Sequence, residues 1–220
     1  MIVVSIVGGS GYSGGELIRL LLNHPEVELR QVTSERFAGK PVTRTHPNLR
    51  RHTSLRFCAI GELTPCDAMF LCLPHGNTMH NLDRYRALAP RLIDLSGDFR
   101  LNSAAAFEKW YGTPHACAER LPEFVYGIPE IYRDRIAGAN WVTGAGCNAT
   151  ATILALRPLF RRGRGLLPEL LARATLHGVP DHEADLFSYL FFDGSFARPL
   201  IELGREDARA QADEILQLLS

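Results

Sequence analysis

The sequence predicts an α/β fold built on a doubly wound parallel sheet. Short and almost wholly apolar segments at residues 2–7, 67–73 and 91–95 are typical of strands buried on both faces. Segments with helical periodicity lie between them, one ending near Asn23 and one over residues 78–88. Strands that alternate with helices favour parallel pairing, because each helix returns the chain to the starting edge of the sheet.

The elements follow in a regular order. The first strand, 2–7, leads into the glycine-rich turn GGSGYSGG at residues 8–15 and then into the first helix. Residues 96–140 are rich in glycine, proline and aromatic residues, so we expect more loop than regular structure there. The other expected elements, in chain order, are strand 27–33, strand 67–73 ended by Pro74, helix 78–88, strand 91–95, the short last strand 141–143 and a helix within 144–160.

Composition excludes several classes of function. Twenty-four basic residues balance twenty-four acidic ones, so no overall field favours nucleic acid or an anionic membrane. The longest apolar runs are too short to span a bilayer, and the N-terminus has no basic signal-peptide region, so we expect a cytoplasmic protein. The five cysteines form no C-x-x-C pair and the histidines have no metal-site spacing, which argues against a disulfide framework and against a metal.

The turn after the first strand has the spacing of a dinucleotide-binding site. Gly8, Gly11 and Gly14 stand where a strand passes into a helix, and the N-terminus of a helix offers free N–H donors to a pyrophosphate. The pattern predicts a Rossmann-type domain. An alternative reading is G-x-S-x-G over residues 11–15, the nucleophile elbow of serine hydrolases, with Ser13 as nucleophile.

The end of the second strand favours NADP over NAD. An NAD site usually carries an acidic residue there, whereas this chain reads Thr33-Ser34-Glu35-Arg36, with hydroxyl groups and an arginine suited to a 2′-phosphate. Glu35 is acidic, so NAD stays open as the alternative cofactor. Pro74 and His75 end the third strand, on the side of the sheet where cofactors bind. The expected cofactor-binding residues are Gly8, Ser10, Gly11, Tyr12, Ser13, Gly14, Ser34, Arg36 and Pro74.

Cys147 is the candidate nucleophile. It follows the strand at 141–143 and the residues Gly-Ala-Gly, and it stands at the start of a helix, where the positive end of the helix favours a thiolate. A cysteine in such a place is often only structural. Together with a nicotinamide site, however, it favours an aldehyde dehydrogenase or an acyl-phosphate reductase.

Six blocks in order carry a resemblance to a known family. GGSGYSGGELIRLLL, TSERFAGKPV, FLCLPHG, DLSGDFRL, VYGIPE and GAGCNATAT resemble the N-acetyl-γ-glutamyl-phosphate reductases, within the semialdehyde dehydrogenase superfamily, over about residues 1–163. Where the arginine-pathway enzymes typically carry Tyr-Pro after the cysteine, this chain has Asn148-Ala149. It is more similar there to the relatives that act on carrier-protein-bound aminoadipyl phosphate in lysine biosynthesis.

The resemblance implies a reaction. Cys147 would attack an acyl phosphate and form a thioester with release of phosphate, and NADPH would reduce the thioester to a semialdehyde, in arginine or lysine biosynthesis. The substrate would be a small acyl phosphate, which an amino-group carrier protein could present. Ser96 and Arg100 in DLSGDFR would lie near the substrate, with Arg100 as a clamp for phosphate or carboxylate, and Asn148 would orient the thioester carbonyl or cap the helix.

Residues 164–220 do not match the family. We therefore expect an NAD(P)-binding domain at 1–163 and an atypical segment at 164–220, truncated or foreign, in place of the family's substrate and dimerisation domain with its catalytic histidine. We assign no catalytic histidine in this chain. The sequence leaves open whether it forms a homo-oligomer. Residues 172–203 faintly resemble the C-terminal end of patatin-like phospholipases. The alternatives are a remnant that binds NADP without turnover, and a patatin-like hydrolase using Ser13 with Asp181, His182 or Asp185.

Overall fold

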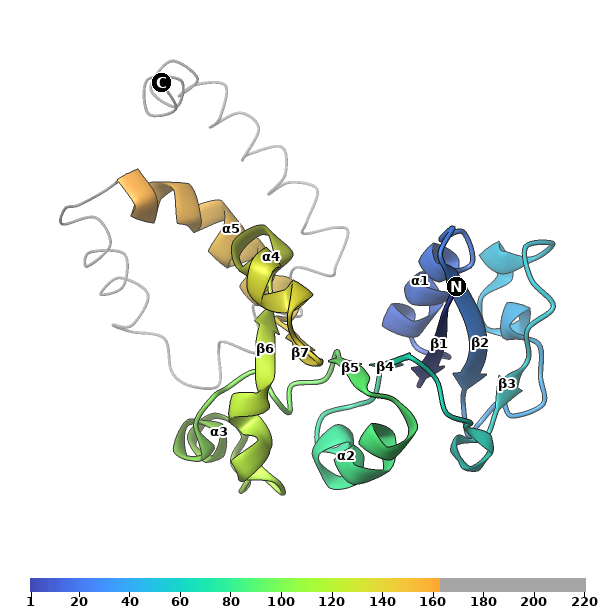
Figure 1. The fold of residues 1–220 in the computed structure, drawn as a ribbon, viewed down its shortest axis with the longest axis horizontal. Coiled ribbons are helices and arrows are strands. Elements are labelled where there is room, and N and C mark those ends of the chain that lie inside the picture. Colours follow the sequence, from blue (N-terminus) through green and yellow to red (C-terminus); the bar gives the residue numbers. More distant parts are fainter. Residues whose placement is uncertain (163–220) are drawn as a thin grey trace, which may run out of the picture. The chain divides into compact units, whose positions relative to one another are not determined.

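Seven parallel strands form one sheet in the computed structural model, which describes residues 1–162 (Figure 1). The strand order is β3-β2-β1-β4-β5-β7-β6. The strands are β1 (Ile2–Val7), β2 (Val27–Thr33), β3 (Phe57–Cys58), β4 (Ala68–Leu71), β5 (Arg91–Asp94), β6 (Phe124–Gly127) and β7 (Trp141–Gly144). All of them lie in the unit formed by residues 1–150, and a second unit begins at Ala151.

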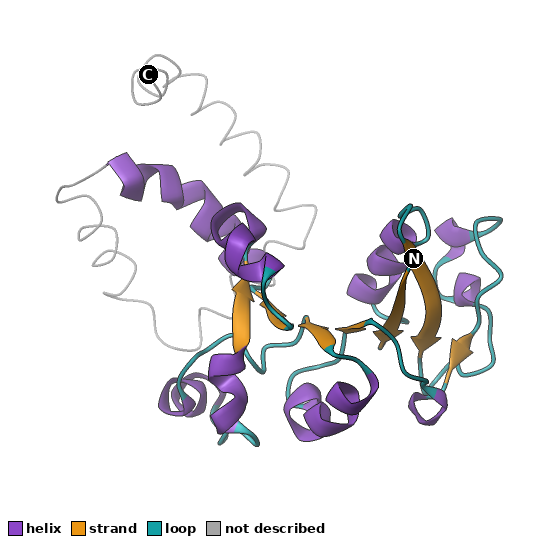
Figure 2. Cartoon of the chain, viewed as in Figure 1, coloured by secondary structure: helices purple, strands orange, loops and turns teal. Residues whose placement is uncertain are grey.

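Helices connect the strands, as Figure 2 shows by colour. The α-helices are α1 (Tyr12–Leu21), α2 (Asn77–Leu88), α3 (Ala104–Tyr111), α4 (Pro129–Ala137) and α5 (Cys147–Arg162). Four short 3-10 turns complete the described part of the chain: η1 (Val42–Arg44), η2 (Pro47–Leu49), η3 (Ile60–Glu62) and η4 (Ala118–Glu123).

Both faces of the sheet are buried, as its apolar strands predict. Alternate residues of a strand point to opposite faces, so Val4 and Ile6 of β1 pack with Ile18 of α1, whereas Val7 packs on the other face. There it meets Met79 and other apolar residues of α2. Helices on both faces make the sheet doubly wound, which confirms the predicted fold class.

One expectation about the middle of the chain is wrong. Residues 96–140, expected to be mostly loop, contain α3, η4, β6 and α4. Helix α3 has ordinary end signals: the Ser103 hydroxyl accepts a hydrogen bond from the Ala106 N–H, and Gly112 ends the helix with φ +72°. Strand β6 is only four residues long and lies at the edge of the sheet, so its pattern is weak.

The strand order places a switch point beside β1. From β1 the chain runs outward through β2 to β3, and it then returns to β4 on the other side of β1. In such sheets, ligands bind outside the carboxyl ends of the strands at the switch point. The turn after β1 and the loop after β4 meet there. The same carboxyl edge holds the loop after β7, which carries Cys147.

The expectations for residues 163–220 lie outside the described residues. These are the atypical segment, its phospholipase-like stretch, and Asp181, His182 and Asp185. Within residues 1–162 no helix is long and apolar enough to cross a membrane. The same part of the chain has no cluster of three metal-binding side chains.

Candidate functional site

The turn after β1 requires glycine at several positions, and Gly8 and Gly14 lie closest to other backbone atoms. Gly8 has φ +81°, a conformation that L side chains rarely adopt, and a Cβ there would overlap the Cys72 carbonyl oxygen. A Cβ on Gly14 would lie 2.5 Å from the Gly9 Cα, so only glycine lets α1 pack this closely on the turn. The turn is held to β2 by two bonds: the Gly8 N–H donates to the Thr33 Oγ1 at 3.1 Å, and the Gly9 N–H donates to the Thr33 carbonyl at 2.8 Å.

A pocket of about 460 Å³ opens beside this turn. Six of the nine expected cofactor residues line it: Gly8, Ser10, Gly11, Ser34, Arg36 and Pro74. The other three do not. Gly14 is buried beneath the turn, and Tyr12 and Ser13 begin α1 with exposed side chains. The pocket therefore joins the ends of β1, β2 and β4.

The end of β2 presents hydroxyl groups to this pocket. The Ser34 hydroxyl donates to the Ser10 hydroxyl at 3.0 Å, which links the end of β2 to the glycine turn. Glu35 also lines the pocket, but its Oε1 accepts a hydrogen bond from the Ile60 N–H at 2.7 Å. The Arg36 guanidinium lies over the Phe37 ring, 5.2 Å from its centroid, so a cation stands at this end of the pocket.

Cys147 lies at the carboxyl edge of the sheet, at the start of a helix that follows β7. It is the first residue of α5, three residues after the last residue of β7 and directly after Gly146, whose φ is +84°. Its side chain is exposed, and its Sγ lies 3.7 Å from the Oδ1 of Asn148, which is exposed as well. An accessible sulfur at a helix N-terminus is the arrangement that a nucleophilic cysteine needs.

Arg100 holds the cysteine loop from the loop after the neighbouring strand, β5. Its Nε donates to the Gly144 carbonyl at 2.9 Å and its Nη2 to the Leu95 carbonyl at 3.2 Å. A Cβ on Gly146 would lie 2.9 Å from the Nη1, so glycine lets the backbone before Cys147 lie against the guanidinium. Two of the three guanidinium nitrogens thus bind backbone carbonyls.

The loop after β5 contains a buried polar cluster. Asp94 is fully buried and accepts hydrogen bonds from the Thr78 hydroxyl at 2.9 Å and the Ser96 hydroxyl at 2.7 Å. Burial raises the pKa of Asp94 to about 6, against the lowering effect of these hydrogen bonds. Ser96 was expected near the substrate. It is only 1% exposed and its hydroxyl donates to Asp94, so it stabilises the conformation of the loop after β5.

Asp98 connects the same cluster to the loop after β4. Its carboxylate accepts from the Gly76 N–H at 2.7 Å and the Met79 N–H at 3.0 Å, so it caps the N-terminus of α2 from another loop. The Gly97 N–H donates to the His75 Nδ1 at 2.6 Å, which leaves the His75 proton on Nε2. His75 is exposed and is therefore oriented, not buried, by this contact.

A second pocket, of about 640 Å³, adjoins the cysteine loop. Arg100, Tyr126, Tyr132 and Thr143 line it, together with Ala145 and Ala149, which flank Cys147 in sequence. The Thr143 hydroxyl is buried and has no hydrogen-bond partner among the described residues. Neither Thr143 nor Tyr126 was among the predicted site residues, although Thr143 falls in the predicted strand 141–143 and Tyr126 in the block VYGIPE.

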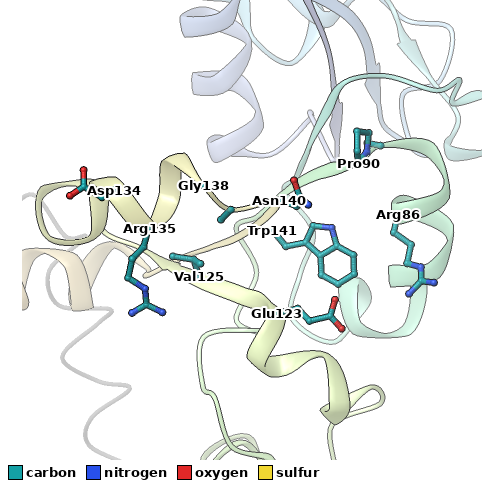
Figure 3. A pocket seen from close by; sticks show the side chains of 11 residues that line it. Arg86, Pro90, Glu123, Val125, Asp134, Arg135, Gly138, Asn140 and Trp141 are labelled. Atoms are coloured by element: carbon teal, nitrogen blue, oxygen red, sulfur yellow. The ribbon is translucent and has the colours of Figure 1, made fainter.

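A further pocket, of about 690 Å³, lies at the wrong edge of the sheet for this chemistry (Figure 3). Pro90, Glu123 and Asn140, which line it, come directly before β5, β6 and β7, so it opens at the amino ends of these strands. Arg86 beside it pairs with the exposed Asp83. We therefore place the candidate site at the two pockets of the carboxyl edge.

Comparisons with known proteins point to a family whose members bind a nicotinamide cofactor in a domain of this kind. Residues 3–139 match the family model described as semialdehyde dehydrogenase, NAD binding domain. A putative [LysW]-L-2-aminoadipate 6-phosphate reductase of Thermomicrobium roseum is 53% identical over 163 residues, which are 74% of this chain and 46% of that protein. An N-acetyl-gamma-glutamyl-phosphate reductase of Acinetobacter baumannii is 44% identical over 169 residues, 76% of this chain and 48% of that protein.

Solved structures agree at the level of the fold. Aspartate semialdehyde dehydrogenase II of Vibrio cholerae, complexed with ASA, superposes with a TM-score of 0.55 at 16% identity, over 73% of this chain and 43% of that one. The chain spans about half the length of the curated relatives it matches. The resemblance seen in the sequence is confirmed, and the chain belongs to the semialdehyde dehydrogenase family, to whose NAD-binding domain its residues 3–139 correspond.

Proposed function

We propose that this chain carries the cofactor and nucleophile half of an NADPH-dependent acyl-phosphate reductase. The observation that carries the proposal is that Cys147 and the glycine turn stand on the same carboxyl edge of one sheet. A hydride donor and a thiolate on one edge are what reduction of an activated acyl group requires.

The residues beside the glycine turn fit a dinucleotide. The close packing of Gly8 and Gly14 leaves room for a pyrophosphate, and the first turn of α1 has no side-chain cap on its N–H groups. Ser10, Gly11 and Pro74 would lie along the dinucleotide. When bound, the reduced nicotinamide supplies a hydride to the acyl carbon.

The second strand supports NADP as the preferred form. Glu35 already accepts a hydrogen bond from the backbone, while Ser34 and Arg36 face the same pocket and can bind a 2′-phosphate. Fluorescence titration with NADPH and NADH tests this preference. We expect NADPH to bind more tightly, and Arg36→Ala to reduce the difference.

The cysteine performs the acyl transfer. Its thiolate attacks the carbonyl carbon of the acyl phosphate, the bond from that carbon to the phosphate oxygen breaks, and phosphate leaves with the electron pair. The acyl group is then a thioester on Cys147. After reduction of the acyl carbon, the carbon–sulfur bond breaks, the thiolate is restored and the semialdehyde is released. Asn148 lies next to the sulfur and can donate its side-chain amide to the acyl oxygen.

The substrate we propose is N-acetyl-glutamyl phosphate or its carrier-bound aminoadipyl counterpart. Asn148-Ala149 after the cysteine and the likeness to the [LysW]-aminoadipate phosphate reductases favour the carrier-bound form, with an amino-group carrier protein as partner. Arg100 keeps its expected role beside the phosphate through the Nη1. The pocket lined by Tyr126 and Thr143 would receive the acyl chain.

The reverse reaction gives the sharpest test. NADP reduction is followed at 340 nm with inorganic phosphate and either N-acetylglutamate semialdehyde or carrier-bound aminoadipate semialdehyde. We expect phosphate-dependent turnover that Cys147→Ser abolishes while NADPH binding persists. NADPH binding without turnover in the wild-type chain would favour the alternative of a binding remnant, and absence of binding would refute the cofactor site.

The hydrolase alternative has little support in the geometry. Ser13 is the second residue of α1 and lies on an exposed helical turn, whereas an elbow nucleophile stands at the sharp turn between strand and helix. Covalent labelling of Ser13 by a fluorophosphonate probe would support that reading against ours.

A further inference from the structure

His46 contacts the glycine turn from a distant part of the chain. It lies between η1 and η2, and its Nε2 is 2.8 Å from the Gly9 carbonyl oxygen, 37 residues away in sequence. The ring is half-buried. It meets the edge of Phe57 at 6.4 Å between centroids, and a Cβ on Gly15 would overlap it. The ring is therefore held between α1 and the core of this face of the sheet.

The contact fixes where the proton of His46 is. A carbonyl oxygen can only accept, so the Nε2 carries the proton and donates it to Gly9. The Gly9 N–H already donates to the Thr33 carbonyl at 2.8 Å. Both polar groups of Gly9 are thus engaged inside the protein, and the peptide between Gly9 and Ser10 has one orientation.

That orientation matters for the next residue. A trans peptide points its C=O and its N–H in opposite directions, so a Gly9 carbonyl held on the His46 side turns the Ser10 N–H to the opposite side. No hydrogen bond within residues 1–162 engages the Ser10 N–H, and Ser10 lines the candidate dinucleotide pocket. A released Gly9 carbonyl could rotate toward that pocket and repel a phosphate.

We propose that His46 is a positioning residue for the pyrophosphate of the dinucleotide. Its Nε2–H keeps the Gly9 carbonyl out of the pocket and leaves the Ser10 N–H free to donate to a phosphate oxygen. The proposal rests on the proposed cofactor site. It also explains why Gly15 follows Gly14, since only glycine leaves space for the imidazole against α1.

The test compares two substitutions of His46 in the full 220-residue chain. His46→Phe keeps a ring against Phe57 and Gly15 but has no donor, and His46→Gln keeps an N–H near the place of the Nε2.

Two ligands are titrated: NADPH, and adenosine 2′-monophosphate, which has the adenosine and the 2′-phosphate but no pyrophosphate. We expect His46→Phe to weaken NADPH about tenfold, the value of one lost hydrogen bond, and to leave the 2′-monophosphate unchanged. His46→Gln should restore most of the NADPH affinity.

The other outcomes separate this inference from the cofactor site itself. If the wild-type chain does not bind NADPH, both are wrong. If it binds and His46→Phe binds equally well, or loses both ligands to the same extent, His46 has only a structural role and the cofactor site stands. Should circular dichroism show that His46→Phe does not fold, Gly15→Ala replaces it in the test, because its added Cβ would displace the His46 ring. It must then give the same selective loss of NADPH for the inference to hold.

Discussion

The Arg100 Nε donates to the carbonyl oxygen of Gly144 at 2.9 Å, although 44 residues separate the two in sequence. This bond joins the loop after β5 to the end of β7, three residues before Cys147. The same loop reaches the other way to the N-terminus of α2 through Asp98. One short segment, residues 94–100, therefore connects the loop after β4, on the cofactor side, with the loop that carries the candidate nucleophile.

Replacing Arg100 should loosen the cysteine loop. Lysine cannot donate to the Gly144 and Leu95 carbonyls in the forked geometry of a guanidinium, so we expect Arg100→Lys to lower the free energy of unfolding by about 2 kcal/mol and to slow turnover. Urea denaturation and the phosphate-dependent assay measure the two effects. Arg86→Lys is the matched control, because Arg86 pairs with the exposed Asp83 and should change stability by less than about 0.5 kcal/mol. Equal stability of both variants would contradict the role of Arg100.

Gly14 should not tolerate a methyl group. A Cβ at this position meets backbone atoms of Gly9 and Gly8 at 2.5–2.9 Å, and backbone cannot move aside as a side-chain tip can. We expect Gly14→Ala to lose NADPH binding and to lower the unfolding midpoint in urea. Gly61→Ala is the control, because a Cβ there has no heavy atom within 4 Å. Undiminished NADPH affinity in Gly14→Ala would show that the turn does not hold the pyrophosphate.

The strands of the first half could be predicted because their signals are local. β1 and β2 are found with the predicted ends. β1 is an almost continuous apolar run bounded by turn residues, as expected of a strand buried on both faces, and β2 has valine and leucine residues spaced among polar ones. β6 was missed because it has four residues, only Phe124 of which is buried, between Pro122 and Pro129. Helix α4 begins with that proline and buries none of its residues fully, so it shows no apolar stripe.

The site divides in the same way. The glycine turn and the helix start at Cys147 are contiguous in sequence, and both stand where they were predicted. The contacts of Arg100, Asp98 and His46 join segments that only the tertiary fold brings together, so no spacing in the sequence shows them. Ser96 illustrates the difference: the motif places it near the substrate, and the fold turns its hydroxyl inward to Asp94.

Asp94 should make stability depend on pH. Burial raises its pKa from 3.8 to about 6, so the folded chain binds a proton that the unfolded chain has lost between these values. The contribution of Asp94 to the free energy of unfolding is therefore most favourable below pH 3.8 and falls by about 3 kcal/mol as the pH rises through about 6. Asp94→Asn removes the carboxyl group that titrates. Urea denaturation at pH 4.5, 5.5 and 7 should show the variant gaining on the wild type as pH rises, and a constant difference would contradict the assignment.

The cysteines should differ sharply in their reactivity. Burial raises the pKa of Cys72 to about 12 and that of Cys117 to about 11, and it also raises the pKa values of Cys58 and Cys66. These four thiols stay protonated at pH 8, and a protonated thiol is a poor nucleophile. Cys147 is the exposed one of the five.

Brief treatment with iodoacetamide at pH 8, followed by peptide mass mapping, should label Cys147 first and abolish turnover in proportion to its labelling. Labelling in 6 M urea, where burial is lost, should reach all five cysteines at similar rates. If any of the other four cysteines reacts as fast as Cys147 in the folded chain, the proposed nucleophile does not differ from them in reactivity, which would contradict the prediction.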